Sequence, residues 1–488
     1  MEKLLIAGEF VEAQGGETYE VRNPADTREV VGRAAKGTVE DAKKAVDTAF
    51  EAFNKWSEMS PSLRAQALRK ASDSIREHAE EIAVMITKEN GKPFVDARSE
   101  VRGFSAHLDF YAGVWPALRG AQVPMSDPWK FGVIMRRPVG VCVAIIPWNN
   151  PIIQLAQKLP PALVAGNTMV VKPASTTPLG IMRVGELLLE AGLPPGVVNI
   201  VTGSGTVLGP ELIRSPKVAK VSFTGDTETG KTIMALAAEK IKRVTLELGG
   251  SDPMIVCDDA NMELAIDGAL FGRFRNTGQG CLCVKRLYLF EQIADEFLDK
   301  LTQRVKLLKV GNGMKPETKM GPCHAMDQRA KVESQVADAV HHGARIVAGG
   351  SRPRGDEYDH GYFYMPTVLA DVDESSRIAK EECFGPALPV FVVKDLEEAI
   401  EKANDSTYGL SSSIFTNDIN RAITAGKMIQ AGKTLVNTAY DVSVELPHGG
   451  VKQTGIGRED GLEVFDYYTE PKVVMIDTST ERPKWLSG

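Results

Sequence analysis

Two of the chain's six cysteines stand two positions apart in RNTGQGCLCVKR, residues 275–286. A structural zinc site usually needs a second cysteine pair, and none accompanies Cys281 and Cys283. A disulfide between residues i and i+2 would be strained. A nucleophilic thiol remains, because the Gly-Gln-Gly lead-in lets the backbone approach a ligand, and nearby amides could lower a thiolate's pKa and bind an oxyanion. From this stretch alone, a nucleophile and an inert cysteine both stay open.

Glu247 is a second candidate, in TLELGG at residues 245–250. A carboxylate between apolar residues and a glycine pair loses solvent, which raises its pKa towards that of a useful general base. A carboxylate that only bonds a neighbouring backbone amide is the alternative.

Lys172 follows an apolar run just before Pro173, where its charge could contact ribose hydroxyls or a phosphate. A surface lysine whose stem packs on apolar neighbours is the alternative. Ser175 belongs to the same region, and a serine there does not repel a 2′-phosphate as an acidic residue would. NADP is therefore admissible.

Two glycine-rich stretches follow apolar runs, TGSGTVLG at 202–209 and FTGDTETG at 223–230. The first departs from G-x-G-x-x-G because Gly209 comes one residue late, and the second lacks the Gly-Lys-Ser/Thr of a P-loop. Each is also compatible with a plain turn between a strand and a helix.

The elements that would position these residues alternate from Val141 onward. Short apolar runs rich in β-branched residues occur at 141–147, 168–173, 197–203, 218–225 and 244–250, with helical patterns at 178–191 and 227–240. Buried strands that alternate with helices predict a parallel sheet. Ligands bind at the carboxyl ends of such strands. The strand ends here are PWNNP (147–151), KPAS (172–175), TGSG (202–205), FTGDTETG and ELGG (247–250).

The rest of the chain divides into three further parts. Thr38 could cap a helix, the pattern repeats at 62–87, and we expect the first hundred residues to be mostly helical. Residues 119–138 suggest a projecting hairpin whose apolar residues need cover from a neighbouring subunit. After Gly250 the alternation restarts with helices near 261–275, 293–309 and 327–344, which predicts a second α/β domain, and KVVMID at 472–477 has strand character.

Length and composition limit the class of protein. A chain of 488 residues is expected to form two or more domains. A net charge of −7 without basic blocks argues against nucleic acid and membrane surfaces as partners. The N-terminus resembles no export signal, and scattered cysteines do not form a disulfide framework, so we expect a cytoplasmic protein.

Taken together, these motifs resemble the aldehyde dehydrogenase superfamily in order along nearly the full chain. The resemblance lies in PWNNP, KPAS, FTGDTETG, ELGG, NTGQGC (276–281), EECFGP (381–386), NDSTYGLSSSIFTND (404–418) and PHGGVKQTGIGRE (447–459).

The resemblance implies a role for each matching residue. Cys281 would be the nucleophile and Cys283 a bystander. Asn149 and the Cys281 backbone N–H would bind the oxyanion, and Glu247 would activate the water that hydrolyses a thioester. The positions that match cofactor contacts are Trp148, Lys172, Ser175, Gly205, Thr224, Gly225, Leu248, Glu382 and Phe384.

Departures from the family pattern bear on the cofactor and the substrate. Asp226 stands where a serine usually faces the pyrophosphate, which puts that contact in doubt. His448 replaces a usual phenylalanine. With Asn150, Gln154 and Gln157 it would make the funnel to Cys281 polar, which favours a small hydroxylated or otherwise polar aldehyde. Arg275 and Arg286 lie near the thiol in sequence, so a semialdehyde, which carries a carboxylate, stays a possible substrate.

We therefore expect an α/β enzyme with two parallel-sheet domains and a small β oligomerisation element. Residues 1–118 and 139–250 would form the dinucleotide-binding domain, 251–446 the catalytic domain, and 119–138 with 447–488 the oligomerisation hairpin and C-terminal segment. The expected reaction is NAD(P)-dependent oxidation of a small polar aldehyde, hydroxyaldehyde or semialdehyde, in a dimer or tetramer, with NADP favoured, NAD possible and no metal. The rivals are a coenzyme A-acylating semialdehyde dehydrogenase and a non-catalytic member of the fold.

Overall fold

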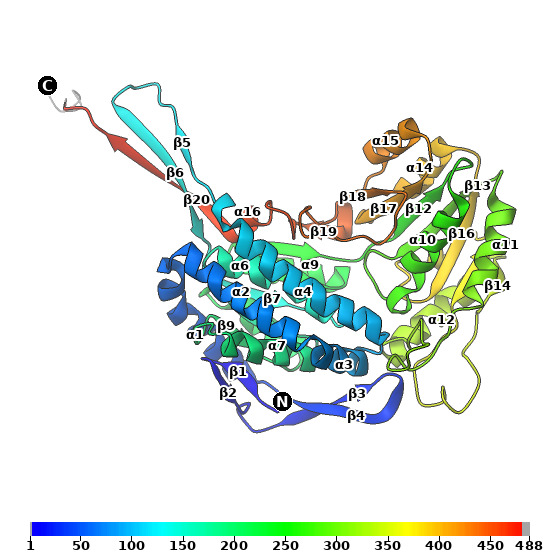
Figure 1. Ribbon diagram of the computed structural model, residues 1–488, viewed down its shortest axis with the longest axis horizontal. Helices are drawn as coiled ribbons and strands as arrows, with labels where there is room; N and C mark the ends of the chain where they lie inside the picture. The colour runs from blue at the N-terminus through cyan, green and yellow to red at the C-terminus, as the bar shows by residue number, and fades with distance from the viewer. Residues whose placement is uncertain (1, 481–488) are drawn as a thin grey trace.

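The computed structural model describes residues 2–480 and has α/β architecture (Figure 1). Two large sheets form separate units, and a small three-stranded sheet projects from the first unit. The predicted fold class is confirmed. No helix within the described residues is long and apolar enough to cross a membrane.

The first sheet has eight strands, and its five central strands are parallel. In spatial order the strands are β19 (Gly455–Ile456), β11 (Arg243–Glu247), β10 (Val218–Thr224), β7 (Val141–Ile145), β8 (Thr168–Lys172), β9 (Val198–Ile200), β1 (Leu4–Ile6) and β2 (Glu9–Val11). The helices of this part of the chain are α1 (Val39–Glu58), α2 (Pro61–Glu77), α3 (Ala79–Asn90), α4 (Phe94–Val114), α5 (Pro151–Ala156), α6 (Leu159–Val164), α7 (Leu179–Glu190), α8 (Gly205–Arg214) and α9 (Thr227–Ala238), with a 3-10 turn η1 at Trp115–Ala117.

The expected cap of α1 is confirmed, whereas the expected helical N-terminus is partly wrong. Thr38 accepts a hydrogen bond from the Asp41 backbone N–H, and the Asp41 side chain accepts one from the Thr38 N–H in return. Before this cap the chain forms β1 and β2 and a hairpin of β3 (Thr18–Asn23) and β4 (Asp26–Ala35). β1 and β2 have three residues each, which is too short for an alternation of apolar and polar residues to be recognised. The helical pattern begins only after Thr38.

The second sheet has seven strands, of which all but the edge strand β14 run parallel. Its spatial order is β14 (Arg345–Ala348), β15 (Thr367–Ala370), β16 (Ala387–Val393), β13 (Val284–Phe290), β12 (Asp252–Val256), β17 (Ser411–Phe415) and β18 (Lys433–Val436). Its helices are α10 (Met262–Phe274), η2 (Arg275–Gly278), α11 (Ala294–Val305), α12 (Met326–His341), α13 (Arg377–Lys380), α14 (Leu396–Asn404) and α15 (Ile419–Met428).

The third sheet pairs β6 (Lys130–Pro138) with β5 (Ala121–Val123) on one side and with β20 (Thr469–Asp477) on the other. It extends away from both large sheets (Figure 1). The C-terminal chain reaches it through η3 (Lys452–Thr454), β19 and α16 (Phe465–Tyr468). Residues 481–488 of the expected C-terminal segment lie outside the described residues.

The parallel strands of the first sheet bring distant residues to one edge. Thr224 pairs with Glu247 at the ends of β10 and β11. Glu247 also pairs with Gly455 of β19, so the C-terminal chain closes over this strand end. Gly455 has a φ of 139°, and a Cβ there would overlap the carbonyl oxygen of Leu246.

We expect Gly455→Ala to lower the thermal unfolding midpoint and to separate β19 from β11, because it adds both backbone strain and a steric overlap. Gly192→Ala is the matched control, since Gly192 has a φ of 93° and nothing lies within 4 Å of where its Cβ would stand. The control should lose only the stability that a side chain costs in a left-handed backbone conformation, about 1–2 kcal/mol. Differential scanning calorimetry measures both, and equal losses would contradict the steric argument.

Candidate functional site

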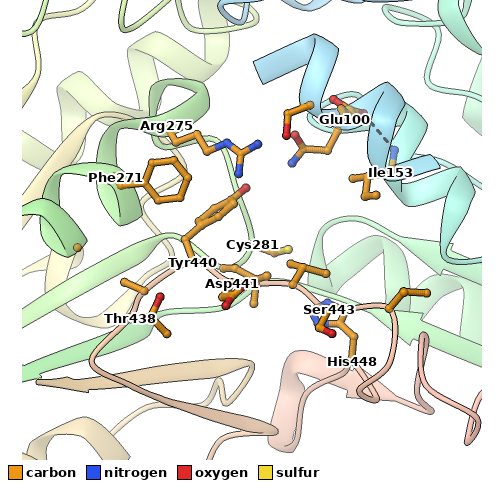
Figure 2. A pocket seen from close by; sticks show the side chains of 18 of the residues that line it. Glu100, Ile153, Phe271, Arg275, Cys281, Thr438, Tyr440, Asp441, Ser443 and His448 are labelled. Atoms are coloured by element: carbon orange, nitrogen blue, oxygen red, sulfur yellow. Dashed lines mark hydrogen bonds between the residues drawn. The ribbon is translucent and has the colours of Figure 1, made fainter. Parts of the chain in front are cut away.

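A cavity of about 920 Å³ leads to Cys281 and is lined by residues from both large units (Figure 2). Its wall comprises side chains of α4, α5 and α10, Phe415, and residues within the segments 275–282 and 437–448. In Figure 2, Cys281 lies between Tyr440 and Arg275 on one side and Ser443 and His448 on the other. Cys281 is partly exposed, and the other five cysteines are buried.

The turn before Cys281 is strained and tightly held. Asn276, Thr277 and Gly278 have φ values of 46°, 60° and 69°. Two consecutive non-glycine residues in this region cost roughly 1–3 kcal/mol each. The Asn276 amide donates to the backbone carbonyl of Asn149 at 2.9 Å, and the Gln279 amide donates to that of Asn276 at 3.1 Å. The Gly-Gln-Gly run thus fixes where Cys281 stands.

The thiol of Cys281 lies in an environment that opposes its ionisation. Burial raises the pKa of the Cys281 thiol to about 12, while the positive charge of Lys285 acts to lower it. Burial also raises the pKa of Cys283, which does not line the cavity. The two cysteines of the motif therefore differ in access to the cavity.

Asn149 is held beside this turn. Its side-chain amide donates to the Gln279 carbonyl at 3.1 Å. Its own backbone carbonyl accepts from Lys92 at 2.7 Å and from Asn276. One N–H of the amide is used in this way, which leaves the second available as a donor.

Glu247 is 4% exposed, and neither carboxylate oxygen accepts a hydrogen bond from the described residues. Burial raises the pKa of Glu247 well above its usual value, and the nearby charge of Glu459 adds to that rise. The Nε2 atom of His448 lies 3.7 Å from Oε2. Burial lowers the pKa of His448 to about 4, so its ring is neutral near pH 7.

A buried ion pair lies next to this carboxylate. Lys158 Nζ lies 2.8 Å from Glu459 Oε1 and donates to the Thr224 hydroxyl at 2.7 Å. The backbones of His448 and Glu459 pair in an isolated antiparallel bridge, which holds these two neighbours of Glu247 side by side. The positive charge of Lys158 opposes the rise in the pKa of Glu247.

The four residues expected to line a polar funnel all border the cavity. Pro151 opens α5, as expected, and places Gln154 and Gln157 on this helix and its C-terminal cap. Asn150 accepts from Lys92 at 2.8 Å, and Gln157 donates to Asp460 at 2.8 Å. Asp460 also bonds His107, whose Nε2 lies 3.0 Å from Oδ1.

Some residues expected at the cofactor site lie near one another. Lys172 is buried, which lowers its pKa to about 8, and its Nζ lies 3.7 Å from where a Cβ of Gly205 would stand. Ser175 is exposed. Trp148 meets Phe384 edge-on at 5.6 Å between ring centroids.

The other expected cofactor residues lie by the strand ends. The Gly225 N–H donates to the Glu247 carbonyl at 3.0 Å. Thr224 is bonded to Lys158, and Leu248 packs against Gly230. Glu382 accepts from the Gly250 N–H at 3.2 Å.

Asp226 caps its own helix. It is the N-cap of α9, and it accepts from the Thr229 N–H at 2.9 Å and from the Thr229 hydroxyl. Its charge therefore stabilises the positive end of this helix.

Several site residues carry no local signal that would predict them. The His324 ring stacks on Trp148 at 4.3 Å, and its Nε2 lies 2.7 Å from the Thr176 hydroxyl. Lys158 lies near the site, yet nothing local in the sequence marks it. Lys285 belongs to RNTGQGCLCVKR, but the motif by itself assigns it no role. Glu459 lies within PHGGVKQTGIGRE, so that motif could have drawn attention to it. Among residues 2–480, no cluster of three or more His, Cys, Asp or Glu side chains could hold a metal ion.

Residues 10–474 match the model of the aldehyde dehydrogenase family. The chain belongs to the aldehyde dehydrogenase family. The predicted resemblance is confirmed, and with it the assignment as an NAD(P)-dependent oxidoreductase that acts on aldehydes.

Named relatives of this aldehyde dehydrogenase include proteins with different substrates. It is 41% identical over 481 residues to a mitochondrial aldehyde dehydrogenase of Leishmania tarentolae, covering 97% of this chain and 94% of the relative. It is 38% identical over 476 residues to succinate-semialdehyde dehydrogenase [NADP(+)] GabD of Escherichia coli, covering 97% and 98%. The solved betaine aldehyde dehydrogenase of Staphylococcus aureus in complex with NAD+ is 37% identical with a TM-score of 0.97, covering 99% of this chain and 97% of that one.

We expect iodoacetamide to alkylate Cys281 alone in the native protein, with a rate that keeps rising roughly tenfold per pH unit from pH 8 to 10. The sign follows from burial, which raises the pKa of this thiol to about 12, so the thiolate fraction is still small at pH 10. An exposed thiol, with a pKa of about 8.5, would level off in this range. Peptide mass spectrometry locates the adduct, with Cys283→Ser as the matched control. Labelling at Cys283 or a plateau near pH 9 would contradict the prediction.

Proposed function

We propose that the protein oxidises a small polar aldehyde to its carboxylic acid through covalent intermediates on Cys281. The observation that carries the proposal is the Glu247 carboxylate, buried without a hydrogen bond among the described residues and 3.7 Å from a cavity-lining histidine. A carboxylate with both oxygens free of protein hydrogen bonds can accept a proton from water, and a hydrolytic step requires such a base.

In the first step the Cys281 thiolate attacks the aldehyde carbon. A sulfur–carbon bond forms, and the electron pair of the C=O bond moves onto oxygen. The free N–H of the Asn149 amide and the Cys281 backbone N–H stabilise this oxyanion. Because the strained turn holds Asn149 and Cys281 together, the donors need no rearrangement when the charge appears.

A bound nicotinamide cofactor would accept the hydride that leaves this carbon. Glu247 then takes a proton from water, and the resulting hydroxide attacks the thioester carbon and releases the Cys281 thiolate and the acid. Burial raises the pKa of Glu247, which makes its carboxylate a stronger base, and the positive charge of Lys158 opposes that rise. A coenzyme A-acylating enzyme would have no use for this base.

The residues fit an NADP site. Lys172 and the exposed Ser175 and Gly205 would hold the adenosine half, with no carboxylate among them to repel a 2′-phosphate. Both carboxylate oxygens of Asp226, beside Gly225, accept hydrogen bonds from Thr229 of its own helix. Glu382 and Phe384 would hold the nicotinamide half, and Trp148 would contact the adenosine half together with Lys172. NADP is therefore favoured, and NAD remains the alternative.

The cavity suits a small substrate with hydroxyl groups or one carboxylate. Polar side chains line it at Asn150, Gln154, Gln157 and His448. Arg286 is excluded as an anchor because its guanidinium donates to the carbonyls of Ser251, Lys402 and Ala403. Arg275 borders the cavity, but it pairs with Asp96 at 3.2 Å and lies 5.2 Å from the ring centroids of both Phe271 and Tyr440.

We further propose that residues 1–118 and 139–250 act as the dinucleotide-binding domain and 251–446 as the catalytic domain. The projecting sheet formed by 119–138 and part of 447–488 would join copies of the chain into a dimer or tetramer. Large apolar side chains of this sheet are exposed to solvent. They include Val473, Met475 and Trp129, which is 61% exposed. A second copy would cover them.

Cys281→Ser should abolish aldehyde-dependent NADPH formation, because a hydroxyl is a far weaker nucleophile than a thiolate. Asn149→Ala should lower kcat about 100- to 1,000-fold, as expected for the loss of one oxyanion donor. Cys283→Ser is the matched control and should retain activity. Initial-rate spectrophotometry with NADP+ and NAD+ over hydroxyaldehydes and semialdehydes measures all four proteins. Equal losses in the two cysteine variants would refute a single nucleophile.

The role of Arg275 distinguishes the two substrate classes. Arg275→Met should lower kcat/KM for a short semialdehyde about tenfold relative to a hydroxyaldehyde. Asp96→Asn should raise the same ratio, because the substitution frees the Arg275 guanidinium from its partner. Steady-state kinetics with both substrates gives the ratio. An unchanged ratio in both variants would exclude Arg275 as a carboxylate anchor.

Val473→Lys combined with Met475→Lys should lower the molar mass in solution towards that of one chain, because two charges would be buried against apolar surface. Light scattering after size-exclusion chromatography measures the mass. Lys472→Glu, on the same strand, is the control, since it changes a charge without burying a new one. A wild-type mass equal to one chain would contradict the proposed assembly.

A further inference from the structure

Lys285 lies directly behind the reactive thiol and is 1% exposed. It is the second residue of β13, two positions after Cys283. Its Nζ donates to the backbone carbonyl of Cys281 at 2.6 Å and lies 3.0 Å from Oε1 of Glu382. A buried ammonium is costly unless it is paired, and these two contacts pair it.

The two carboxylate oxygens of Glu382 have different surroundings. Glu382 Oε1 accepts from Lys285 and from the Gly250 N–H at 3.2 Å. Oε2 is not the atom that these two groups contact, and it lies 2.6 Å from where a Cβ of Gly249 would stand. Lys285 therefore holds one oxygen and leaves the other available to the hydroxyl groups of a ligand.

Five other ionisable groups lie near Cys281 and Lys285, and four of them can carry negative charge. Asp252 of β12 is buried, which raises its pKa to about 7, and its Oδ2 is unpartnered among the described residues. Glu247 of β11 and Glu382 also act to raise the pKa of Cys281, and Cys283 interacts with Lys285. Lys433 of β18 is a second cation near the thiol, but its Nζ donates to the Asp441 carbonyl at 2.7 Å.

We propose that Lys285 is a positioning residue that links the two halves of the active site. One ammonium holds the Cys281 backbone and supports its thiolate, and it also orients Glu382 for the ribose of the cofactor. The second part rests on the proposed function, because it assigns Glu382 to the cofactor. Lys285 takes no proton and forms no covalent bond in the reaction.

Removing the charge of Lys285 and removing the charge of Glu382 should change the alkylation rate of Cys281 in opposite directions. Without Lys285, the carboxylates of Asp252 and Glu382 would oppose the thiolate alone, so Lys285→Met should slow alkylation of Cys281. Without the Glu382 charge, Lys285 would act on the thiol unopposed, so Glu382→Gln should speed it. Both variants should bind NADP+ more weakly. A purely structural role would not move the alkylation rate in opposite directions.

The experiment uses the full chain without added cofactor, and it measures the iodoacetamide rate constant at Cys281 between pH 7 and 10. Calorimetric titration gives the dissociation constant of NADP+. Lys285→Met should lower the rate constant on the order of tenfold at each pH and weaken NADP+ binding on the order of tenfold, as expected when one charge interaction is lost. Lys285→Arg should restore both, and Lys433→Met, the matched control, should leave NADP+ binding unchanged.

If Lys285→Met does not fold, Glu382→Gln decides alone: faster alkylation with weaker NADP+ binding supports the link. An unchanged alkylation rate in either folded variant, or a change in only one of the two properties, overturns it. Neither readout needs turnover. A wild-type protein that oxidises no aldehyde would refute the proposed function and leave this test intact.

Discussion

The burial of the Glu247 carboxylate is the constraint on which the rest of the site depends. A buried carboxylate without hydrogen bonds is costly, by several kcal/mol, so its surroundings must hold it in place. The protein does so with backbone from far along the chain. β19 pairs with β11 at Glu247, and the bridge between His448 and Glu459 closes the other side. Both carboxylate oxygens are thereby left without a protein partner inside the site.

Charge around this carboxylate and the thiol is balanced locally. Lys158 pairs with Glu459 near Glu247, and Lys285 pairs with Glu382 near Cys281. Both lysines are fully buried, and both have fixed partners, which lets two reactive groups that disfavour each other's ionisation share one site. The strained turn at 276–278 serves the same end, because it joins the segment before Cys281 to Asn149 of the first unit. Backbone strain and buried ion pairs thus occur together, in the region where chemistry is proposed.

Much of this can be predicted from the sequence, for identifiable reasons. Strand-and-helix alternation after Val141 has a clear period, and Thr38 carries a capping pattern that needs only a few residues to recognise. Motif position separates Cys281 from Cys283, and the structure leaves only Cys281 partly exposed among the six cysteines. These features are local, or they are fixed by the order of motifs along the chain.

Other features depend on contacts that no local pattern records. The stacking of His324 on Trp148 joins residues that lie far apart in the chain. The sequence places Asp226 where it could disturb the cofactor contact, but whether it faces a ligand or caps α9 depends on a side-chain rotation. The three-residue strands β1 and β2 are too short to show a period. Lys285 lies in the same motif as Cys281, but its pairing with Glu382 depends on a segment far along the chain.

The central claim is that Cys281 carries the acyl group and Glu247 releases it, and pre-steady-state kinetics of Glu247→Gln tests it most directly. In stopped-flow mixing with NADP+ and an accepted aldehyde, the account predicts a burst of NADPH of about one equivalent per active site, followed by turnover slowed on the order of 100-fold, with an acyl adduct on the Cys281 peptide. Steady turnover at the wild-type rate, or loss of the burst itself in a folded protein, would contradict it.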